Sequence, residues 1–212
     1  MRIVVHYEPV SQNILLVTSG VFHPPYFGRL ALHEALKQLD GFAFRHVPSL
    51  EALPSDLDSF SAMVLYYHGK TISEAALARL DGFVGGGGGI LALHSATASF
   101  KDSKRYSEIL GGRFIGHGPV ENFEVTCRKY DIFNGIAPFT IRDELYIHDL
   151  QPGVDVHFTT MQEGREAPVV WTHSYGAGRV CYAVPGHTTN SLKHPAMQEI
   201  LRRGLKWACG AE

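Results

Sequence analysis

The sequence has few cysteines, no long apolar run and no excess of charge of either sign. Its three cysteines, at positions 127, 181 and 209, form no CxxC pair, which argues against a disulfide framework and suits a reducing cytoplasm. Lys and Arg total 19 against 21 Asp and Glu, and no basic run is present, so the phosphate-binding charge of a nucleic-acid-binding protein is missing. The longest apolar stretches are far shorter than a membrane span, and the first residues lack the apolar core of a signal peptide. The sequence therefore predicts a cytoplasmic protein that binds neither nucleic acid nor membrane.

What the sequence does contain is enough apolar material for a folded core. Hydrophobic residues make up 45% of the 212 residues and charged residues 19%, which excludes intrinsic disorder. The length and the absence of linkers or repeats predict a single domain over residues 1–212.

Short apolar runs alternate with longer amphipathic runs in the first two-thirds of the chain. The predicted strands are Ile14–Thr18, Phe42–Val47, Ala62–Tyr67 and Ile90–Leu93. Helices are predicted over Leu30–Leu39 with Gly41 as C-cap, after the N-cap Ser73, and over Tyr106–Leu110. This alternation predicts an α/β fold with a mostly parallel sheet and helices on both faces.

The pattern changes from about Val120, where apolar runs follow one another without helices between them. We expect antiparallel strands or a β-rich insertion at Phe123–Cys127, Phe139–Ile141, Val154–Thr159, Val169–Trp171 and Arg179–Val184. A closing helix is predicted over Pro195–Trp207. Gly112–Pro119 is interpreted as a glycine-rich loop of the kind that lines sites, and Arg2–Tyr7 as an extra edge strand.

Histidines follow several of the predicted buried strands. They are His23, His68, His94 and His187. Ligands of open parallel sheets bind at the carboxyl ends of the strands, so these positions predict a histidine-lined crevice. The alternative is that each imidazole caps a carbonyl group or packs its ring, as a histidine at a strand end often does.

The glycine run Gly85–Gly89 does not indicate a nucleotide site. A phosphate-binding loop follows a strand and opens a helix, whereas this run follows a predicted helix and precedes a strand. We therefore interpret it as a helix C-cap and tight turn, and the sequence contains no nucleotide-cofactor motif.

The segment after Leu93 has the strand-then-turn context of a nucleophile elbow. His94 at its tip could act as acid, base or ligand, and Ser95 could act as a nucleophile with His187 as its base. The glycines of a Gly-x-Ser-x-Gly motif are absent, which weakens the serine-hydrolase interpretation. No cysteine is available there for thiol catalysis.

Further along the chain, four residues complete the candidate site. Glu144 is the best acid or base partner, although a solvated turn explains it as well, and Tyr146 and His117 could contact a substrate. Trp171 could be core or the aromatic wall of a sugar pocket. His94, His117 and His187 with Glu144 would also suit a divalent transition metal, but no HxH or HExxH spacing supports this.

Several ordered motifs resemble those of ThuA-like (trehalose utilisation) proteins. They are Gly86–Thr97, Gly111–His117, Asp143–Tyr146, Pro168–Trp171 with Tyr175–Val180, and Gly186-His187. The resemblance extends from about Asn13 to Ala208. It implies the fold of class I glutamine amidotransferase-like domains, a flavodoxin-like parallel sheet flanked by helices, and a role in carbohydrate metabolism.

The same resemblance bears on chemistry. Glutaminases of that superfamily place a cysteine at the elbow and a histidine late in the chain, whereas here the elbow holds His94 and the late histidine matches His187. Glutamine hydrolysis through a thioester is therefore not expected. Two imidazoles facing each other could instead share a proton or a metal ion.

We therefore predict a carbohydrate-processing enzyme that acts on a sugar or oxidised sugar derivative. The predicted catalytic residues are His94, His187 and Glu144, and the predicted substrate-binding residues are His23, His68, Ser95, His117, Tyr146 and Trp171. Two alternatives remain: a non-catalytic sugar-binding or regulatory module, and a serine hydrolase that uses Ser95 and His187. A homodimer is compatible with such a fold.

Overall fold

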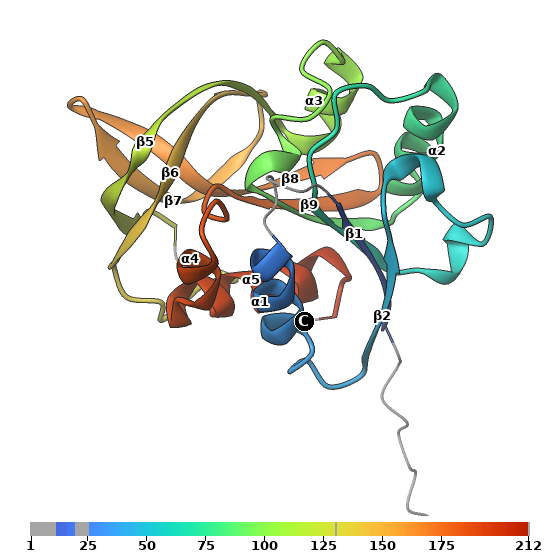
Figure 1. The fold of residues 1–212 in the computed structure, drawn as a ribbon, viewed down its shortest axis with the longest axis horizontal. Coiled ribbons are helices and arrows are strands. Elements are labelled where there is room, and N and C mark those ends of the chain that lie inside the picture. Colours follow the sequence, from blue (N-terminus) through green and yellow to red (C-terminus); the bar gives the residue numbers. More distant parts are fainter. Residues whose placement is uncertain (1–11, 20–25, 130, 212) are drawn as a thin grey trace, which may run out of the picture.

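The computed structural model describes residues 12–19, 26–129 and 131–211, and within them nine strands form one mixed sheet. The strand order is β2-β1-β3-β4-β9-β8-β7-β5-β6. Helices α1, α4 and α5 cover one face, and α2 and α3 cover the other (Figure 1). The strands are β1 (Gln12–Thr18), β2 (Phe42–Val47), β3 (Ala62–Tyr66), β4 (Gly89–Leu93), β5 (Gly112–Cys127), β6 (Phe139–Leu150), β7 (Asp155–Gln162), β8 (Arg165–Tyr175) and β9 (Gly178–Ala183). The helices are α1 (Tyr26–Leu36), α2 (Glu74–Gly85), α3 (Lys104–Leu110), α4 (Thr189–Lys193) and α5 (Pro195–Ala208), with 3₁₀ turns at Leu50–Ala52, Leu57–Ser59 and His94–Ala96.

The expectation of a mostly parallel, flavodoxin-like sheet is not confirmed. Strands β2, β1, β3, β4 and β9 are parallel, but β8, β7, β5 and β6 extend the same sheet in antiparallel pairs. The hairpins β7–β8 and β8–β9 turn through two residues each, and connections this short can join only antiparallel strands. The β-rich last part of the chain therefore continues the sheet instead of forming a separate insertion.

Local sequence signals explain most of the element ends. The Ser73 hydroxyl accepts a hydrogen bond from the Ala76 amide at 3.1 Å, as an N-cap does, and Gly87 turns the chain into β4 with a φ of +118°. Helix α1 starts earlier than predicted and ends at Leu36, so Gly41, with a φ of +77°, belongs to the turn before β2 and is not a C-cap. The edge strand predicted at residues 2–7 lies outside the described residues.

The expected loop at Gly112–Pro119 is wrong, because these residues form the first half of β5. Their partners lie on β6, and the ladder shifts register between Phe114 and Gly116 and again between His117 and Val120. Glycines at such irregularities allow a strand to bend without leaving the sheet. Helix propensity and glycine content are local properties of the sequence. The pairing of residues 112–119 with β6 instead depends on a partner strand 20 or more residues away, which such local properties do not reveal.

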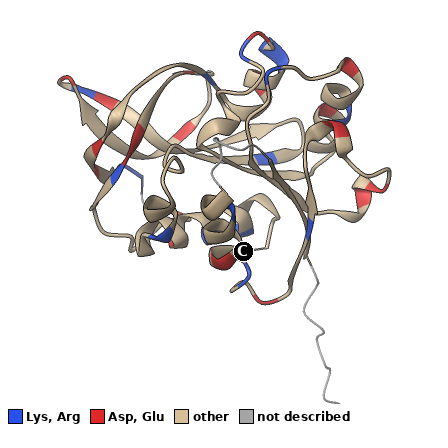
Figure 2. Cartoon of the chain, in the orientation of Figure 1, with Lys and Arg blue, Asp and Glu red and all other residues tan. Residues whose placement is uncertain are grey.

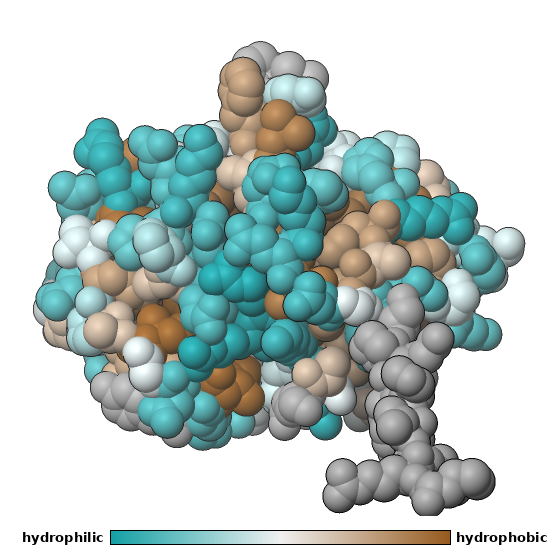
Figure 3. Space-filling view, turned by 90° about the horizontal axis from the view of Figure 1, so that it is seen from below, coloured by the Kyte–Doolittle hydropathy of each residue, from teal (hydrophilic) through white to brown (hydrophobic). Residues whose placement is uncertain are grey.

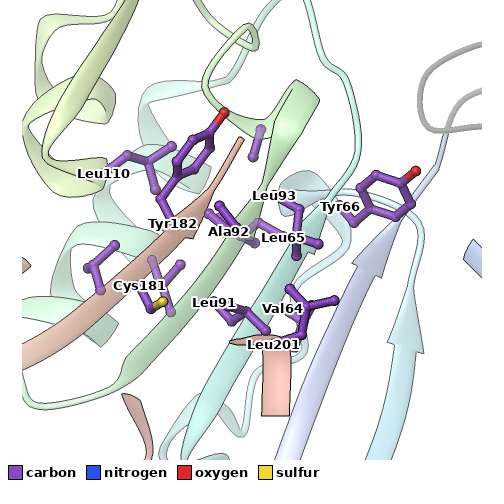
Figure 4. Packing of buried hydrophobic residues seen from close by; sticks show 14 of the residues in the cluster. Val64, Leu65, Tyr66, Leu91, Ala92, Leu93, Leu110, Cys181, Tyr182 and Leu201 are labelled. Carbon is purple, nitrogen blue, oxygen red and sulfur yellow. The ribbon is translucent and has the colours of Figure 1, made fainter. Parts of the chain in front are cut away.

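The core lies on both sides of the parallel strands. Figure 4 shows side chains of β3, β4 and β9 packed between Leu110 of α3 and Leu201 of α5, and all of those labelled are fully buried. Seen from below, the face over α1, α4 and α5 is mainly hydrophilic, with apolar groups in separate patches (Figure 3). Basic and acidic residues are both spread over the ribbon (Figure 2). Among the described helices, none is long and apolar enough to cross a membrane.

Candidate functional site

His94 lies at the sharp turn that follows β4. Its φ of +41° is in the left-handed region, which a non-glycine residue adopts only where surrounding structure holds it. The ring is fully buried, and its Nδ1 lies 3.0 Å from the carbonyl oxygen of Val184. Since a carbonyl oxygen only accepts, Nδ1 carries the proton, and Nε2 faces the carboxylate of Glu144 at 3.6 Å.

His187 lies beside His94. It follows β9, the parallel neighbour of β4, so both histidines leave the sheet at the same edge. Their ring centroids are 5.4 Å apart, and Nδ1 of His187 lies 3.2 Å from Oε2 of Glu144. The structure thus brings together the two imidazoles that strand-end reasoning placed in one crevice.

Glu144 is the residue on which three imidazoles converge. It belongs to β6, not to a solvated turn, and its side chain is only 12% exposed. Besides the contacts of Oε2 with His94 and His187, its Oε1 lies 3.0 Å from Nδ1 of His117. A carboxylate in this position can hold a proton on one imidazole or help bind a cation.

The neighbouring carboxylate, Asp143, holds the loop that carries His187. It is fully buried and accepts hydrogen bonds from the main-chain N–H groups of Glu144, Gly186, His187 and Thr188, at 2.7 to 3.3 Å. Burial raises the pKa of Asp143, and these hydrogen bonds oppose the increase. Tyr66 fixes the same loop by donating its hydroxyl to the Gly186 carbonyl oxygen at 2.5 Å.

An open cleft of about 530 Å³ leads to Glu144. The Tyr146 ring is tilted against the His94 ring with centroids 4.0 Å apart, and the Phe114 ring centroid lies 4.6 Å from that of Tyr146, so two aromatic rings form one wall. The cleft is lined by His68, Ala98, Lys101, Phe114, Ile115, Gly116, His117, Glu144 and Tyr146.

Two groups that carry or can carry positive charge lie at the rim of this cleft. Lys101 places its Nζ 4.5 Å above the Phe114 ring. His68 follows β3, and partial burial lowers its pKa, with Lys101 adding to the decrease. Strand-end reasoning found His68, and Phe114 belongs to the segment Gly112–Pro119 that was expected to line a site, whereas nothing in the sequence singled out Lys101.

Two predicted site residues, Ser95 and Trp171, are not brought into this cleft. The Ser95 hydroxyl is buried and donates to the Tyr67 carbonyl oxygen at 3.1 Å. Trp171 corrects the expectation of a sugar-binding wall, because its ring is fully buried, stacks on Tyr182 and donates its indole N–H to Leu110 at 3.0 Å. His23 lies outside the described residues.

A larger cavity, of about 680 Å³, lies away from these histidines, next to the glycine turn before β4. Its one arginine, Arg79, already donates to the carbonyl oxygens of Leu53 and Pro54. Among the described residues, no histidine lines this cavity, and burial raises the pKa of the cysteine that does, Cys209, to about 12. The smaller histidine-lined cleft is therefore the better candidate site.

The sequence as a whole also matches a known family. A model of the ThuA family, described as trehalose utilisation, fits residues 13–208. The chain belongs to the ThuA family. The match to the family model confirms the resemblance inferred from the motifs. No curated protein matches the chain in sequence.

Several solved structures share this fold. A ThuA-like protein from Parabacteroides merdae aligns with a TM-score of 0.84 at 20% identity, over 97% of this chain and 91% of that one. A cytoplasmic protein from Salmonella typhimurium aligns at 0.73 and 14% identity, over 93% and 99% of the two chains. A cold-adapted β-galactosidase from Rahnella aligns at 0.67 and 13% identity, over 92% of this chain but 31% of that one. At such identities the similarity establishes the fold alone.

The ThuA motifs of this chain have two structural roles. Those containing His117 and Glu144 line the cleft, and those containing His94 and His187 place their imidazoles against Glu144. Those of β8 and β9, which include Trp171, build the buried sheet beside it. The resemblance in sequence therefore spans both the site and its support.

Proposed function

We propose that this ThuA-family protein processes a sugar or an oxidised sugar derivative bound in the cleft above Glu144. The observation that carries the proposal is the convergence of three imidazole nitrogens on one carboxylate, 3.0 to 3.6 Å away, at the floor of an open cleft. Such a set can take a proton from one substrate atom and return it to another.

The three central residues have different access to a substrate. The side chain of His94 is fully buried, that of Glu144 is 12% exposed and that of His187 is 25% exposed. His187 is therefore the group placed to exchange a proton with the substrate, and Glu144 stabilises the charge that forms on its ring. The fully buried His94 is the third residue of the set.

The walls of the cleft favour a carbohydrate. The rings of Phe114 and Tyr146 offer apolar surface to the C–H face of a sugar, and His68, Lys101 and His117 offer polar groups to its hydroxyls. The positive charge of Lys101 suits an oxidised derivative that carries a carboxylate.

Glutaminase activity is not expected. Among the cysteines, Cys181 is buried in β9 and burial raises the pKa of its thiol to about 12. Cys127 and Cys209 also have raised pKa values because they are partly buried. None of the three lies at the His94 turn where the thioester route requires a thiol.

The test is turnover of a defined panel by the purified protein, with trehalose, other disaccharides, aldonates, uronates and keto-sugars followed by NMR. Glu144→Gln and His187→Asn should each abolish turnover, while the surface variant Asp149→Asn should keep it. Binding without turnover of any compound would instead favour the non-catalytic sugar-binding module. Covalent labelling of Ser95 by a serine-directed phosphonate would favour the hydrolase.

We also propose that residues 1–212 form one domain, that the protein is cytoplasmic and that it forms a homodimer. The mass in solution, measured by light scattering, tests the last point: the mass of one chain, 23.4 kDa, would contradict a dimer.

A further inference from the structure

We infer that His94, Glu144 and His187 bind one divalent transition-metal ion of the zinc type. The inference concerns the cleft of the proposed function and names a cofactor for it, but metal binding can be measured without any substrate.

The spacing of the donor atoms suits such an ion. One ligand atom from each of the three residues lies within 4.8 Å of the other two. The Glu144 oxygen Oε2 lies 3.2 Å from Nδ1 of His187 and 3.6 Å from Nε2 of His94. Ligands about 2.0–2.2 Å from a tetrahedral zinc ion are roughly 3.4 Å apart, so these two separations already match.

The orientation of the His94 ring also fits a metal ligand. Its Nδ1 lies 3.0 Å from the Val184 carbonyl oxygen, so the other ring nitrogen, Nε2, is the atom directed toward Oε2 of Glu144, 3.6 Å away. Metal-binding histidines commonly donate their second ring N–H to a main-chain carbonyl in this way.

The outer contacts of Glu144 and His187 fit the same arrangement. His117 lies 3.0 Å from Oε1, which leaves Oε2 directed at the other two imidazoles. Asp143 accepts the main-chain N–H of His187 at 3.1 Å and so holds the loop of the third ligand in place. Second contacts of this kind orient the ligands of metal sites.

The donor set also selects the type of ion. Two imidazoles and one carboxylate suit Zn²⁺, Co²⁺, Ni²⁺ or Fe²⁺, whereas Mg²⁺ and Ca²⁺ prefer oxygen ligands alone. Exposure increases from His94 to Glu144 to His187, so the ion would have its open side toward the cleft, within reach of water or substrate.

Among the described residues outside the cleft, no histidine belongs to a cluster of two imidazoles and a carboxylate of this kind. Nδ1 of His157 lies 3.0 Å from Oδ1 of Asp131, but its Nε2 is 2.7 Å from the Thr172 hydroxyl, so this imidazole faces one carboxylate and no second imidazole. His157→Asn is therefore a matched control that removes a histidine paired with a carboxylate.

The experiment uses full-length protein stripped with a chelator and titrated with Zn²⁺ by calorimetry and with Co²⁺ by visible absorption. We expect one ion per chain, and a Co²⁺ spectrum of low-symmetry, nitrogen- and oxygen-ligated metal that Zn²⁺ displaces. Glu144→Gln and His187→Ala should weaken binding by more than about 100-fold, and His117→Ala by about 10- to 100-fold, since it acts through Glu144. His157→Asn and His68→Asn should bind as the wild type does.

The wild-type titrations do not depend on the folding of any variant. They therefore test the metal site even if circular dichroism shows that a variant is unstable. Absence of a one-to-one site for both ions in the wild type would overturn the inference, as would unchanged affinity in a folded Glu144→Gln protein. Sugar turnover that persists after complete metal removal would contradict the metal's role but leave the proposed function intact. Binding of one metal ion per chain without turnover of any sugar would support the metal site but contradict the proposed function.

Discussion

The carboxylate of Asp143 on β6 accepts the main-chain N–H of His187 at 3.1 Å, across 44 positions of sequence. This one contact ties the strand that carries Glu144 to the loop that carries His187. It explains why two residues from distant segments keep their side chains 3.2 Å apart. Asp143 is thus a positioning residue, because it faces the main chain and not the cleft.

Replacing Asp143 by Asn should loosen this loop. An amide offers one accepting oxygen where the carboxylate has two, so some of the four N–H groups around it lose their partner. We expect Asp143→Asn to lower the free energy of unfolding by about 1–3 kcal/mol and to reduce kcat more than it raises KM. Urea denaturation and steady-state kinetics measure the two effects.

The control is Asp149→Asn, which removes an exposed carboxylate that pairs with Arg113 on the surface. It should change the free energy of unfolding by less than about 1 kcal/mol. Equal losses in the two variants would contradict the role given to Asp143.

A methyl group at Gly186 should displace His94. A Cβ built at that position would lie 2.8 Å from Cβ of His94 and 3.4 Å from the Tyr66 ring, and the first contact is closer than atoms tolerate. We expect Gly186→Ala to cost about 1–3 kcal/mol of stability and to abolish most activity.

Gly82 of α2 provides the comparison, since a Cβ there would meet nothing within 4 Å. Gly82→Ala should be neutral or stabilise the protein by up to about 1 kcal/mol, because alanine favours a helix. If Gly186→Ala behaves in the same way, the close contact does not constrain His94.

His148 should make the protein less stable in mild acid. It is 8% exposed, its Nε2 lies 2.9 Å from the Thr97 hydroxyl, and burial lowers its pKa to about 3. An unfolded histidine titrates near 6.5, so between pH 6.5 and 3 the unfolded state binds more protons. Stability present above pH 6.5 is therefore lost as the pH falls, by at most about 1.4 kcal/mol per pH unit from this residue.

Urea midpoints at pH 7 and pH 5 measure this dependence. A His148→Gln protein should be less stable than the wild type at pH 7 but show a flatter dependence on pH. An unchanged slope would show that other groups cause the acid sensitivity.

Ser95 distinguishes the two catalytic hypotheses. Its hydroxyl is 1% exposed and donates to Tyr67, so the acid–base proposal gives it no chemical role. We expect Ser95→Ala to keep kcat within about threefold while lowering stability by about 1 kcal/mol. A loss of activity equal to that of His187→Asn, in a protein that melts normally, would favour the serine hydrolase.

Part of this site could be predicted because its signals are local. Apolar runs identified β3, β4 and β9, and the histidine that follows each strand became a candidate site residue without knowledge of the fold. His94 and His187 converge because β4 and β9 are adjacent and parallel. Trp171 misled for the same reason, since a local run cannot tell a core indole from one that lines a cleft.

The position of Glu144 next to these histidines could not be predicted from such local signals. Strand β6 is five places from β4 in the sheet, which corresponds to about 24 Å at 4.8 Å per strand if the sheet were flat. Nevertheless its carboxylate lies 3.6 Å from Nε2 of His94, so the sheet is not flat and its β5–β6 end comes back to the end of β4. A longer strand prediction would at least have placed Glu144, Tyr146 and His148 on one face, since alternate residues of a strand point the same way.

The sequence by itself determined where the buried strands run and which side chains follow them, because hydrophobic burial and turn geometry act over a few residues. Only the tertiary structure decided that a carboxylate from the far edge of the sheet meets those imidazoles. Strand register and sheet curvature depend on partners distant in the chain, and the β5–β6 ladder that carries Glu144 contains two register shifts.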